Sequence, residues 1–429
     1  MSRSKFKILI SVALLLLSGG GATVAISADL NGEFAAMARC EALRGSVWGA
    51  FAVTADGDTL VNVNGGVRML PASNVKLITT GAALYYLGPD FRFRTCLACD
   101  GPVIGGRLKG RLHIIGGGDP SLCDRHKSTG DSLATFTQWL SLVRKAGISS
   151  IEGGVVGDAG HFDGEDFLGD WSLEDISLEY SSAALGLNIS DNLIDDGSGK
   201  ACTASAPQHC ARQFASFLRD HGITVPEDES GWEGTPDSGG LTVIGGTSST
   251  GLGNLITVAN HESENIYAEA LFREMGLRVS GSASYEKSAE ALGEVLSRMG
   301  LGGSLDSVQI VDGSGLSRKN YVSPEFLVAF LTNMGGRPEF GAFLQSIPSP
   351  GNGTLKNRLT GKDGSLRARV HMKSGTMNGV RCFSGYILPS DGDSGKMIAF
   401  SIMTNNVVAA GSSLASLMDA MVVRLAAEN

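Results

Sequence analysis

A serine and a lysine stand three positions apart at the start of an apolar run, PASNVKLITT, residues 71–80. On a helix, residues i and i+3 share a face, so the hydroxyl of Ser73 and the amine of Lys76 come within hydrogen-bonding reach. A serine hydroxyl becomes a nucleophile when a neighbouring base takes its proton, and a lysine is such a base once burial lowers its pKa. The apolar neighbours of Lys76 predict that burial. Four-residue matches are frequent by chance, so a solvated surface pair is the alternative for this pattern taken alone.

A second pattern follows downstream in HESENIYAEALFREMG, which begins at His261. Its apolar spacing predicts an amphipathic helix that ends at Gly276, with Ser263 and Asn265 at its head. The Ser263 hydroxyl can relay a proton toward a leaving amine, and the Asn265 amide can hold a peptide bond of a substrate.

The third pattern, HMKSGTMNG, is a predicted strand near the other end of the chain. The cation of Lys373, with the hydroxyls of Ser374 and Thr376, suits a substrate that ends in a free carboxylate. Gly375 leaves the strand open for a substrate to lie alongside it. The backbone N–H groups of Ser73 and Thr376 are the expected oxyanion hole, a contribution of roughly 3 to 4 kcal/mol per donor.

The order SxxK, SxN, K(S/T)G is the signature of penicillin-binding proteins and serine β-lactamases. Within that group the chain resembles the class C low-molecular-mass penicillin-binding proteins, peptidase family S13, over nearly all of its length. The resemblance also rests on IIGGGDPSL, on VDGSGLSRKNYVSP and on the 190 residues that separate Ser73 from Ser263. Family members are D-alanyl-D-alanine carboxypeptidases and endopeptidases of the periplasm or cell wall.

The resemblance implies a serine DD-peptidase that cleaves the D-Ala-D-Ala bond of peptidoglycan stem peptides, and D-Ala-diaminopimelate cross-links, through an acyl-enzyme on Ser73 with Lys76 as general base. It also implies covalent acylation by penicillin and other β-lactams, no cofactor or metal, and peripheral association with the cell wall or membrane. One departure is Ser374, where many members carry threonine; both supply a hydroxyl. The other is the short segment Leu193 to Gln208, which has no room for the further inserted domain that members tend to carry.

By the same resemblance, four residues contact the distal end of the stem-peptide side chain: Asp175 and Tyr180 in DWSLEDISLEY, Arg318 in GLSRKN, and Asn378 after the KSGT strand. The carboxylate of Asp175 suits the ammonium group of a diaminopimelate, and Arg318 suits its carboxylate. The alternative for each is an ordinary surface position.

The elements that must position these residues come from both ends of the chain. A helix at 31–46, two strands around the Asp56-Gly57 turn and a helix ending at Leu87 precede the middle of the sequence. Three strands and a helix, SSLASLMDAMVVRLAA, close it. We expect an α+β fold of the penicillin-binding-protein and β-lactamase type, in which one five-stranded antiparallel sheet has helices on both faces.

The middle of the chain differs from the two ends in composition and pattern, with many glycines, short predicted strands and predicted amphipathic helices. It predicts a second α/β domain, residues 90–240, inserted into a catalytic domain made of 29–89 and 241–429. Ahead of both, residues 1–28 have the cations, apolar run and small residues of a cleaved signal peptide.

Net charge restricts the kinds of partner that the protein can bind, and cysteine content bears on its disulfides. Loss of the three leader cations takes the formal net charge from −9 to −12, which argues against a nucleic-acid partner. All seven cysteines follow the leader, and export makes disulfides plausible; Cys202 and Cys210, which bracket a short loop, are the predicted pair. Cys96 and Cys99 form a lone CxxC without the second pair that a zinc site needs.

Two other functions fit parts of the pattern. A serine β-lactamase must deacylate quickly, but the chain shows no ExxxN-type stretch with an evident water-activating glutamate, and its long insertion is atypical. A non-catalytic protein that senses β-lactams or binds the cell wall would keep the fold without needing the complete motif set.

Overall fold

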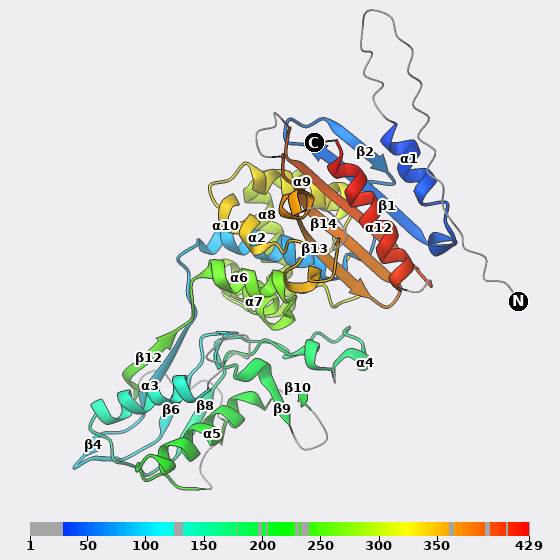
Figure 1. Cartoon of the computed structure of the whole chain (residues 1–429). Helices are drawn as coiled ribbons and strands as arrows, with labels where there is room; N and C mark the ends of the chain where they lie inside the picture. The colour runs from blue at the N-terminus through cyan, green and yellow to red at the C-terminus, as the bar shows by residue number, and fades with distance from the viewer. Residues whose placement is uncertain are drawn as a thin grey trace, which may run out of the picture.

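The computed structural model describes the chain in ten stretches, and the predicted leader, residues 1–28, lies outside them. Figure 1 shows a larger lobe, which holds both ends of the described chain, and a smaller lobe built from the middle of the sequence. None of the described helices is long and apolar enough to cross a bilayer. The described stretches are 29–123, 132–176, 178–195, 200–202, 205–227, 231–232, 240–359, 364–390, 395–408 and 411–428.

The larger lobe contains a five-stranded antiparallel sheet with strand order β13-β14-β15-β1-β2. Strands β1 and β15 pair from Val47 opposite Asn405 to Thr54 opposite Ile398, so segments from the two ends of the chain close one sheet. The predicted α+β fold is therefore confirmed. The strands are β1 (Val47–Thr54), β2 (Thr59–Val63), β13 (Val370–Met377), β14 (Val380–Ile387) and β15 (Ile398–Asn405).

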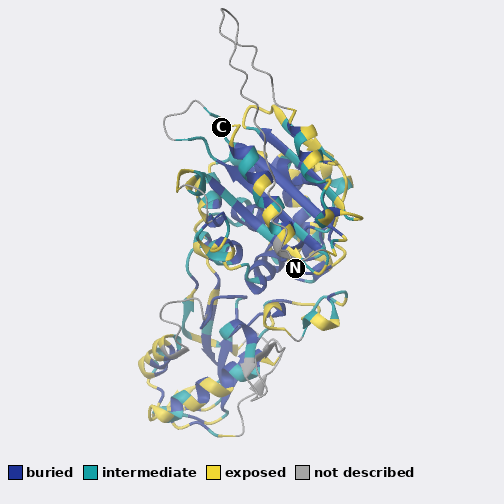
Figure 2. Cartoon of the chain, turned by 45° about the vertical axis from the view of Figure 1, so that its right-hand side comes forward, coloured by how far each residue is buried: buried dark blue, intermediate teal, exposed yellow. Residues whose placement is uncertain are grey.

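Helices cover both faces of this sheet, and Figure 2 shows the buried strands between them. Helices α1 (Leu30–Met37) and α12 (Gly411–Ala426) share one apolar core with the sheet, while α9 (Pro324–Gly335) packs on β1, β14 and β15 from the other side. The first helix is shorter than the predicted 31–46, because the chain becomes extended at Cys40 before the short 3-10 helix η1 (Glu41–Leu43).

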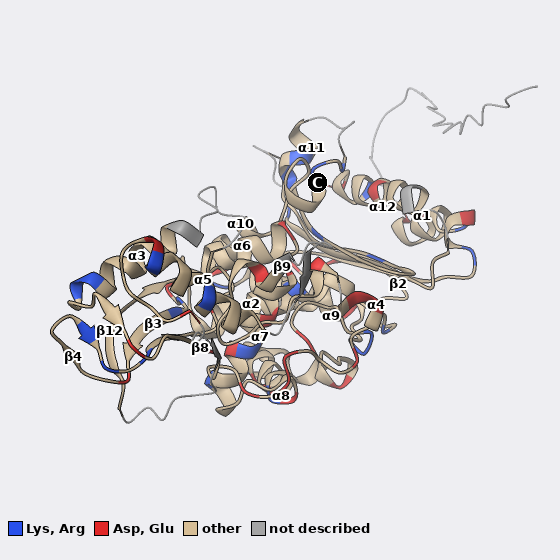
Figure 3. Cartoon of the chain, turned by 90° about the horizontal axis from the view of Figure 1, so that it is seen from below, with Lys and Arg blue, Asp and Glu red and all other residues tan. Residues whose placement is uncertain are grey.

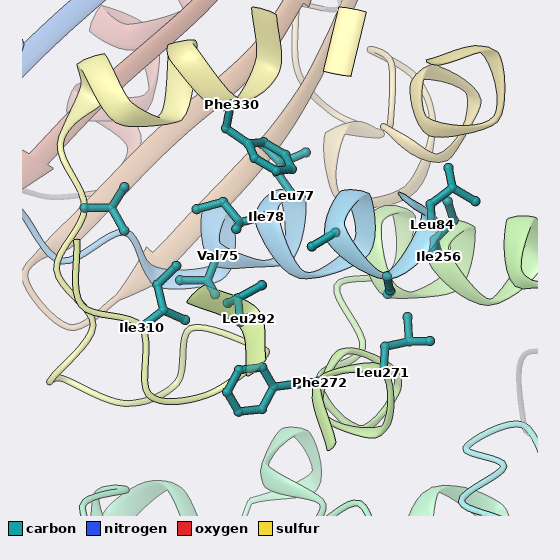
Figure 4. Packing of buried hydrophobic residues seen from close by; sticks show 14 of the residues in the cluster. Val75, Leu77, Ile78, Leu84, Ile256, Leu271, Phe272, Leu292, Ile310 and Phe330 are labelled. Carbon is teal, nitrogen blue, oxygen red and sulfur yellow. The ribbon is translucent and has the colours of Figure 1, made fainter. Parts of the chain in front are cut away.

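Helix α2 (Val75–Leu87) lies inside the larger lobe, and its residues from Val75 to Leu84 are all buried. Figure 4 shows its apolar side chains between Phe330 of α9 and Phe272 of α7 (Asn265–Ser280). Lys76 belongs to this buried run and has no exposed surface. The predicted burial of the lysine is thus confirmed, and the surface-pair alternative is wrong.

Helix α7 continues past its predicted end at Gly276 and stops at Ser280, where Gly281 adopts φ 79°. A left-handed residue after the last turn is a common helix stop, and glycine adopts it without a Cβ penalty. Gly276 serves a different purpose: a Cβ there would lie 2.3 Å from the hydroxyl of Ser288 on α8 (Tyr285–Leu296). The glycine lets two helices approach closely.

The smaller lobe has its own sheet, with order β11-β8-β6-β3-β12, and its own apolar core. Strand β12 pairs antiparallel with β3 and therefore belongs to the smaller lobe, and the chain returns to the larger lobe after Ser248. The predicted division at residue 240 falls just before β12. The strands are β3 (Arg94–Cys99), β6 (Leu112–Ile115), β8 (Val155–Asp158), β11 (Gly231–Trp232) and β12 (Thr242–Ser248).

The remaining elements connect or cover these sheets. In the view of Figure 3, Lys and Arg lie scattered among Asp and Glu over both lobes. The further strands are β4 (Val103–Ile104), β5 (Arg107–Leu108), β7 (Ser150–Ile151), β9 (Leu193–Asp195) and β10 (Lys200–Cys202). The further α-helices are α3 (Ser132–Lys145), α4 (Leu173–Ile176), α5 (Ala206–Asp220), α6 (Leu252–His261), α10 (Phe340–Ser346) and α11 (Gly364–Arg369).

Candidate active site

Ser73 lies in a single 3-10 turn, η2 (Ala72–Asn74), which leads directly into α2. Two contacts fix this turn. The Asn74 amide donates to Ser384 Oγ of β14 over 2.7 Å, and a Cβ on Gly315 would lie 1.9 Å from the Ala72 carbonyl oxygen. Only glycine fits there, because Gly315 also has φ 85°. A side-chain hydrogen bond from the sheet and close backbone packing by Gly315 therefore hold the turn that carries the nucleophile candidate.

The amine of Lys76 has three polar neighbours. Its Nζ lies 3.1 Å from Ser73 Oγ, 2.5 Å from Asn265 Oδ1 and 2.8 Å from the carbonyl oxygen of Ser314. Burial lowers the pKa of Lys76 from 10.5 to about 8, against the opposing charges of nearby carboxylates, Glu269 first among them. A fraction of Lys76 is therefore in the neutral amine form near neutral pH.

A neutral amine has two N–H groups and one lone pair. The Asn265 and Ser314 oxygens can only accept, so both N–H groups point at them. The remaining position, occupied by the lone pair, faces Ser73 Oγ. Neutral Lys76 is then oriented to accept the hydroxyl proton of Ser73, as a general base requires.

A second buried lysine faces the same site from the sheet. Lys373 on β13 donates to Ser263 Oγ over 2.9 Å and to the Ser374 carbonyl oxygen over 3.0 Å. Burial, followed by the charge of Lys76, holds the pKa of Lys373 well below its ordinary value. Ser263 has φ 63°, which is uncommon for a non-glycine residue, and its hydroxyl oxygen accepts from this lysine.

Two buried carboxylates behind Lys76 were not among the site residues that the motifs predicted. Glu269, one turn after Asn265 on α7, accepts from the backbone N–H groups of Gly313 and Ser314 over 3.0 and 2.7 Å. Asp312 accepts from the backbone N–H groups of Gly315 and Ser317. Burial raises the pKa of both acids. The helical spacing from Asn265 to Glu269 was the sequence signal that could have found the first.

A segment of the middle region, residues 171–176 and 178–182, reaches the larger lobe beside this network. Asn265 donates its amide to the Tyr180 carbonyl oxygen over 2.6 Å, and the Trp171 indole donates to Asp312 Oδ2 over 3.0 Å. The Tyr180 hydroxyl donates to Asp175. The inserted chain therefore touches both the asparagine of the second motif and the loop that positions Lys76.

One cavity of about 550 Å³ brings the predicted residues together. Lys76 and Lys373 lie buried behind it. Gly375 stands between the lining residues Ser374 and Thr376 on β13, and a Cβ there would meet the Pro71 carbonyl oxygen at 2.7 Å. Arg318 donates to the Asn378 carbonyl oxygen. The predicted residues that line the cavity are Ser73, Asp175, Tyr180, Ser263, Asn265, Arg318, Ser374, Thr376 and Asn378.

The described residues contain no cluster of three or more His, Cys, Asp or Glu side chains able to hold a metal ion. Cys96, Cys99 and Cys210 carry free thiols. The side chain of Cys202, the predicted partner of Cys210, lies outside the described residues.

Fold and site together define a serine enzyme of the penicillin-binding class, with a serine-lysine pair at a helix start and a second serine-lysine pair at a sheet edge. The chain belongs to the D-Ala-D-Ala carboxypeptidase 3 (S13) family, which matches residues 30–197 and 200–428. It is a serine-type DD-peptidase, as the motif resemblance predicted.

Individual relatives agree with this family. The chain is 28% identical to a D-alanyl-D-alanine carboxypeptidase of Actinomadura sp. (strain R39), over 97% of this chain and 89% of that one. It is 24% identical to the D-alanyl-D-alanine carboxypeptidase DacB of Haemophilus influenzae, over 80% and 82%. The fold is that of penicillin-binding protein 4 from H. influenzae, with a TM-score of 0.76 at 20% identity, covering 92% of this chain and 99% of that one.

Proposed function

We propose that this chain hydrolyses the D-Ala-D-Ala bond of peptidoglycan stem peptides through an acyl-enzyme on Ser73. The observation that carries the proposal is the environment of Lys76, whose two other polar neighbours can only accept and so leave its lone pair for Ser73. The family membership and the carboxypeptidase relatives support the substrate class.

In the first step, Lys76 takes the Ser73 proton as Oγ attacks the carbonyl carbon of the penultimate D-alanine. The backbone N–H groups of Ser73 and Thr376 receive the developing oxyanion. Ser263, polarised by Lys373, relays to the departing nitrogen the proton that Lys76 took from Ser73, and D-alanine leaves. Water then attacks the ester and regenerates Ser73.

Substrate orientation is assigned to two groups of residues. The hydroxyls of Ser374 and Thr376 bind the terminal carboxylate, with the amine of Lys373 behind them. At the other end of the cavity, Asp175, held by Tyr180, and Arg318, placed over Asn378, bind the amino-acid side chain of the stem peptide. An acid and a guanidinium in one pocket match a side chain that bears both an ammonium and a carboxylate.

The direct test is covalent labelling with fluorescent penicillin, followed by D-alanine assay on diacetyl-lysyl-D-Ala-D-Ala. Wild type is expected to label and to release D-alanine, and Ser73→Ala to do neither. A protein that labels but releases no D-alanine would be a β-lactam sensor, and rapid steady hydrolysis of a chromogenic cephalosporin would identify a β-lactamase. A wild type that never labels contradicts the Ser73 acyl-enzyme altogether.

We also propose export to the periplasm with removal of residues 1–28, and a division into a catalytic domain (29–89 and 241–429) and an insert (90–240). The layout of the leader and the peptidoglycan substrate support export. The mass of the protein purified from the periplasmic fraction would give the new N-terminus, and a mass that includes the leader would overturn cleavage. Limited proteolysis that cuts near residues 90 and 240 would support the division.

A further inference from the structure

Arg381 lies on β14 directly opposite Thr376 of β13, and its guanidinium donates to the Thr376 hydroxyl. Directly opposed residues of an antiparallel pair share a face of the sheet, so Ser374 and its opposite residue Phe383 lie on that face as well. These four residues line a cavity of about 300 Å³, which shares Thr354, Ser374 and Thr376 with the active-site cavity. Arg381 therefore reaches, from the second cavity, one of the two hydroxyls that are proposed to bind the terminal carboxylate of the substrate.

The contact with Arg381 orients the Thr376 hydroxyl. A hydroxyl group has one proton to donate and two lone pairs that accept, whereas a guanidinium can only donate. Arg381 therefore occupies a lone pair of Thr376 and leaves the hydroxyl proton to point elsewhere. A carboxylate, which can only accept, is the complementary group for that proton.

The charge of Arg381 is not neutralised within the protein. Arg381 has no ion-pair partner among the described residues, whereas the other arginine of this cavity, Arg358, is paired with Asp419 over 2.9 Å. Unlike Arg358, Arg381 can therefore direct its full positive charge at a bound anion. The anion that the proposed reaction brings to the Thr376 hydroxyl is the carboxylate at the end of the substrate.

Lys373, the cation of the third motif, is less suited to supply a constant positive charge. Its amine is buried and donates to Ser263 Oγ over 2.9 Å. Burial, followed by the charge of Lys76, holds the pKa of Lys373 well below its ordinary value. A guanidinium, in contrast, stays charged throughout the pH range in which proteins work. The fixed positive charge beside the carboxylate site is therefore that of Arg381.

We infer that Arg381 is a specificity-determining residue, which holds the Thr376 hydroxyl ready to donate and supplies the charge that makes the enzyme require a free carboxylate at the end of its substrate. Arg381 acts through Thr376 and takes no part in acyl transfer at Ser73. The inference rests on the proposed DD-peptidase function and names the group that selects a free peptide end. The same peptide with an uncharged end should lose this interaction and no other.

The test compares diacetyl-lysyl-D-Ala-D-Ala with its C-terminal carboxamide, and mass spectrometry measures the released D-alanine and D-alaninamide. The wild type should cleave the acid with a higher kcat/KM than the amide, because only the acid carries the charge. Arg381→Gln removes the cation but keeps a side-chain amide that can donate to Thr376. We expect kcat/KM for the acid to fall about tenfold or more and kcat/KM for the amide to stay within about twofold of wild type.

Two further variants separate charge from position. Lys356→Gln is the matched control, because Lys356 is an exposed cation near Thr354 in sequence and lines neither cavity. This variant removes the same charge and should leave both substrates within about twofold of wild type. Arg381→Lys keeps the charge without the planar fork, so its loss on the acid should be smaller than that of Arg381→Gln. A loss as large in Arg381→Lys as in Arg381→Gln would contradict the role of the charge.

Ionic strength gives a readout that does not depend on the amide. Salt screens charge attraction, so kcat/KM for the acid should fall with added sodium chloride in the wild type and in Lys356→Gln, and less steeply in Arg381→Gln. Equal losses on acid and amide, an undiminished salt dependence in Arg381→Gln, or a wild type that cleaves both substrates equally well would overturn the inference. A wild type that releases neither product and is not acylated by penicillin contradicts the proposed function instead.

Discussion

The amine of Lys76 lies 3.1 Å from the hydroxyl oxygen of Ser73, inside a helix whose first ten residues are all buried. Burial removes water from the charged form of Lys76 and so disfavours it, and this desolvation lowers the pKa of Lys76 to about 8. Burial alone does not orient the amine. The acceptor oxygens of Asn265 and Ser314 fix its N–H groups and thereby turn its lone pair toward Ser73.

The first prediction concerns pH. Because the base must be neutral, the rate constant for acylation by penicillin should rise with pH up to about 8 and then level off as Lys76 becomes fully deprotonated. Stopped-flow or quenched labelling between pH 6 and pH 10 measures it. A rate that falls as the pH rises toward 8 would contradict the assignment of Lys76 as base.

The second prediction concerns Glu269, whose negative charge opposes the lowering of the Lys76 pKa. Burial raises the pKa of Glu269 to about 8, so its charge acts on Lys76 chiefly near and above that pH. Glu269→Gln removes the charge there, so the midpoint of the acylation profile should move to lower pH. The other charged groups around Lys76 are Asp312, Glu264 and Lys373, and they are unchanged in this variant.

Glu269→Asp is the matched control, since it keeps the charge but withdraws it from the N–H groups of Gly313 and Ser314. Its plateau rate should fall while its pH midpoint stays near that of wild type. A purely structural role for Glu269 would lower the plateau in both variants and move the midpoint in neither.

The third prediction concerns the contact between the inserted chain and the loop behind Lys76. Trp171→Phe removes the indole N–H that donates to Asp312 and leaves this buried acid with one donor fewer. A hydrogen bond to a charged group is worth about 1.5–3 kcal/mol, so the free energy of unfolding should fall by about that amount. Urea unfolding measures it, and an unchanged midpoint would show that the bond contributes nothing.

The fourth prediction concerns packing around α2. A Cβ at Gly81 would lie 2.7 Å from Phe330 and 3.2 Å from Phe343, so Gly81→Ala should destabilise the protein by about 1–3 kcal/mol despite the better helix propensity of alanine. Gly293→Ala, in the interior of α8 where the Cβ meets nothing within 4 Å, should stabilise it by about 0.5–1 kcal/mol. Thermal unfolding of both variants tests the pair, and equal shifts would contradict the packing explanation.

The sequence by itself determined the parts of this protein that local pattern encodes. Strand-like runs and the Asp56-Gly57 turn signal predicted the strands of the main sheet, and the apolar run around Lys76 predicted its burial. The three motifs in order predicted the class of enzyme. These features need only neighbouring residues, or a fixed order of short segments, to be recognised.

Only the tertiary structure decided which groups meet across long separations. Glu269 belongs to no motif, and Asp312 lies in VDGSGLSRKNYVSP, which assigns it no role. Their contacts are with backbone N–H groups some 45 residues away from Glu269 and with an indole 141 residues from Asp312. A cavity of about 300 Å³ lined by Ser374, Arg358 and Phe383 likewise exists because residues near 358, strand β14 and helix α12 meet at one sheet edge. Such contacts are set by how whole elements pack, and the periodicity of a single segment holds no information about the partner it will meet.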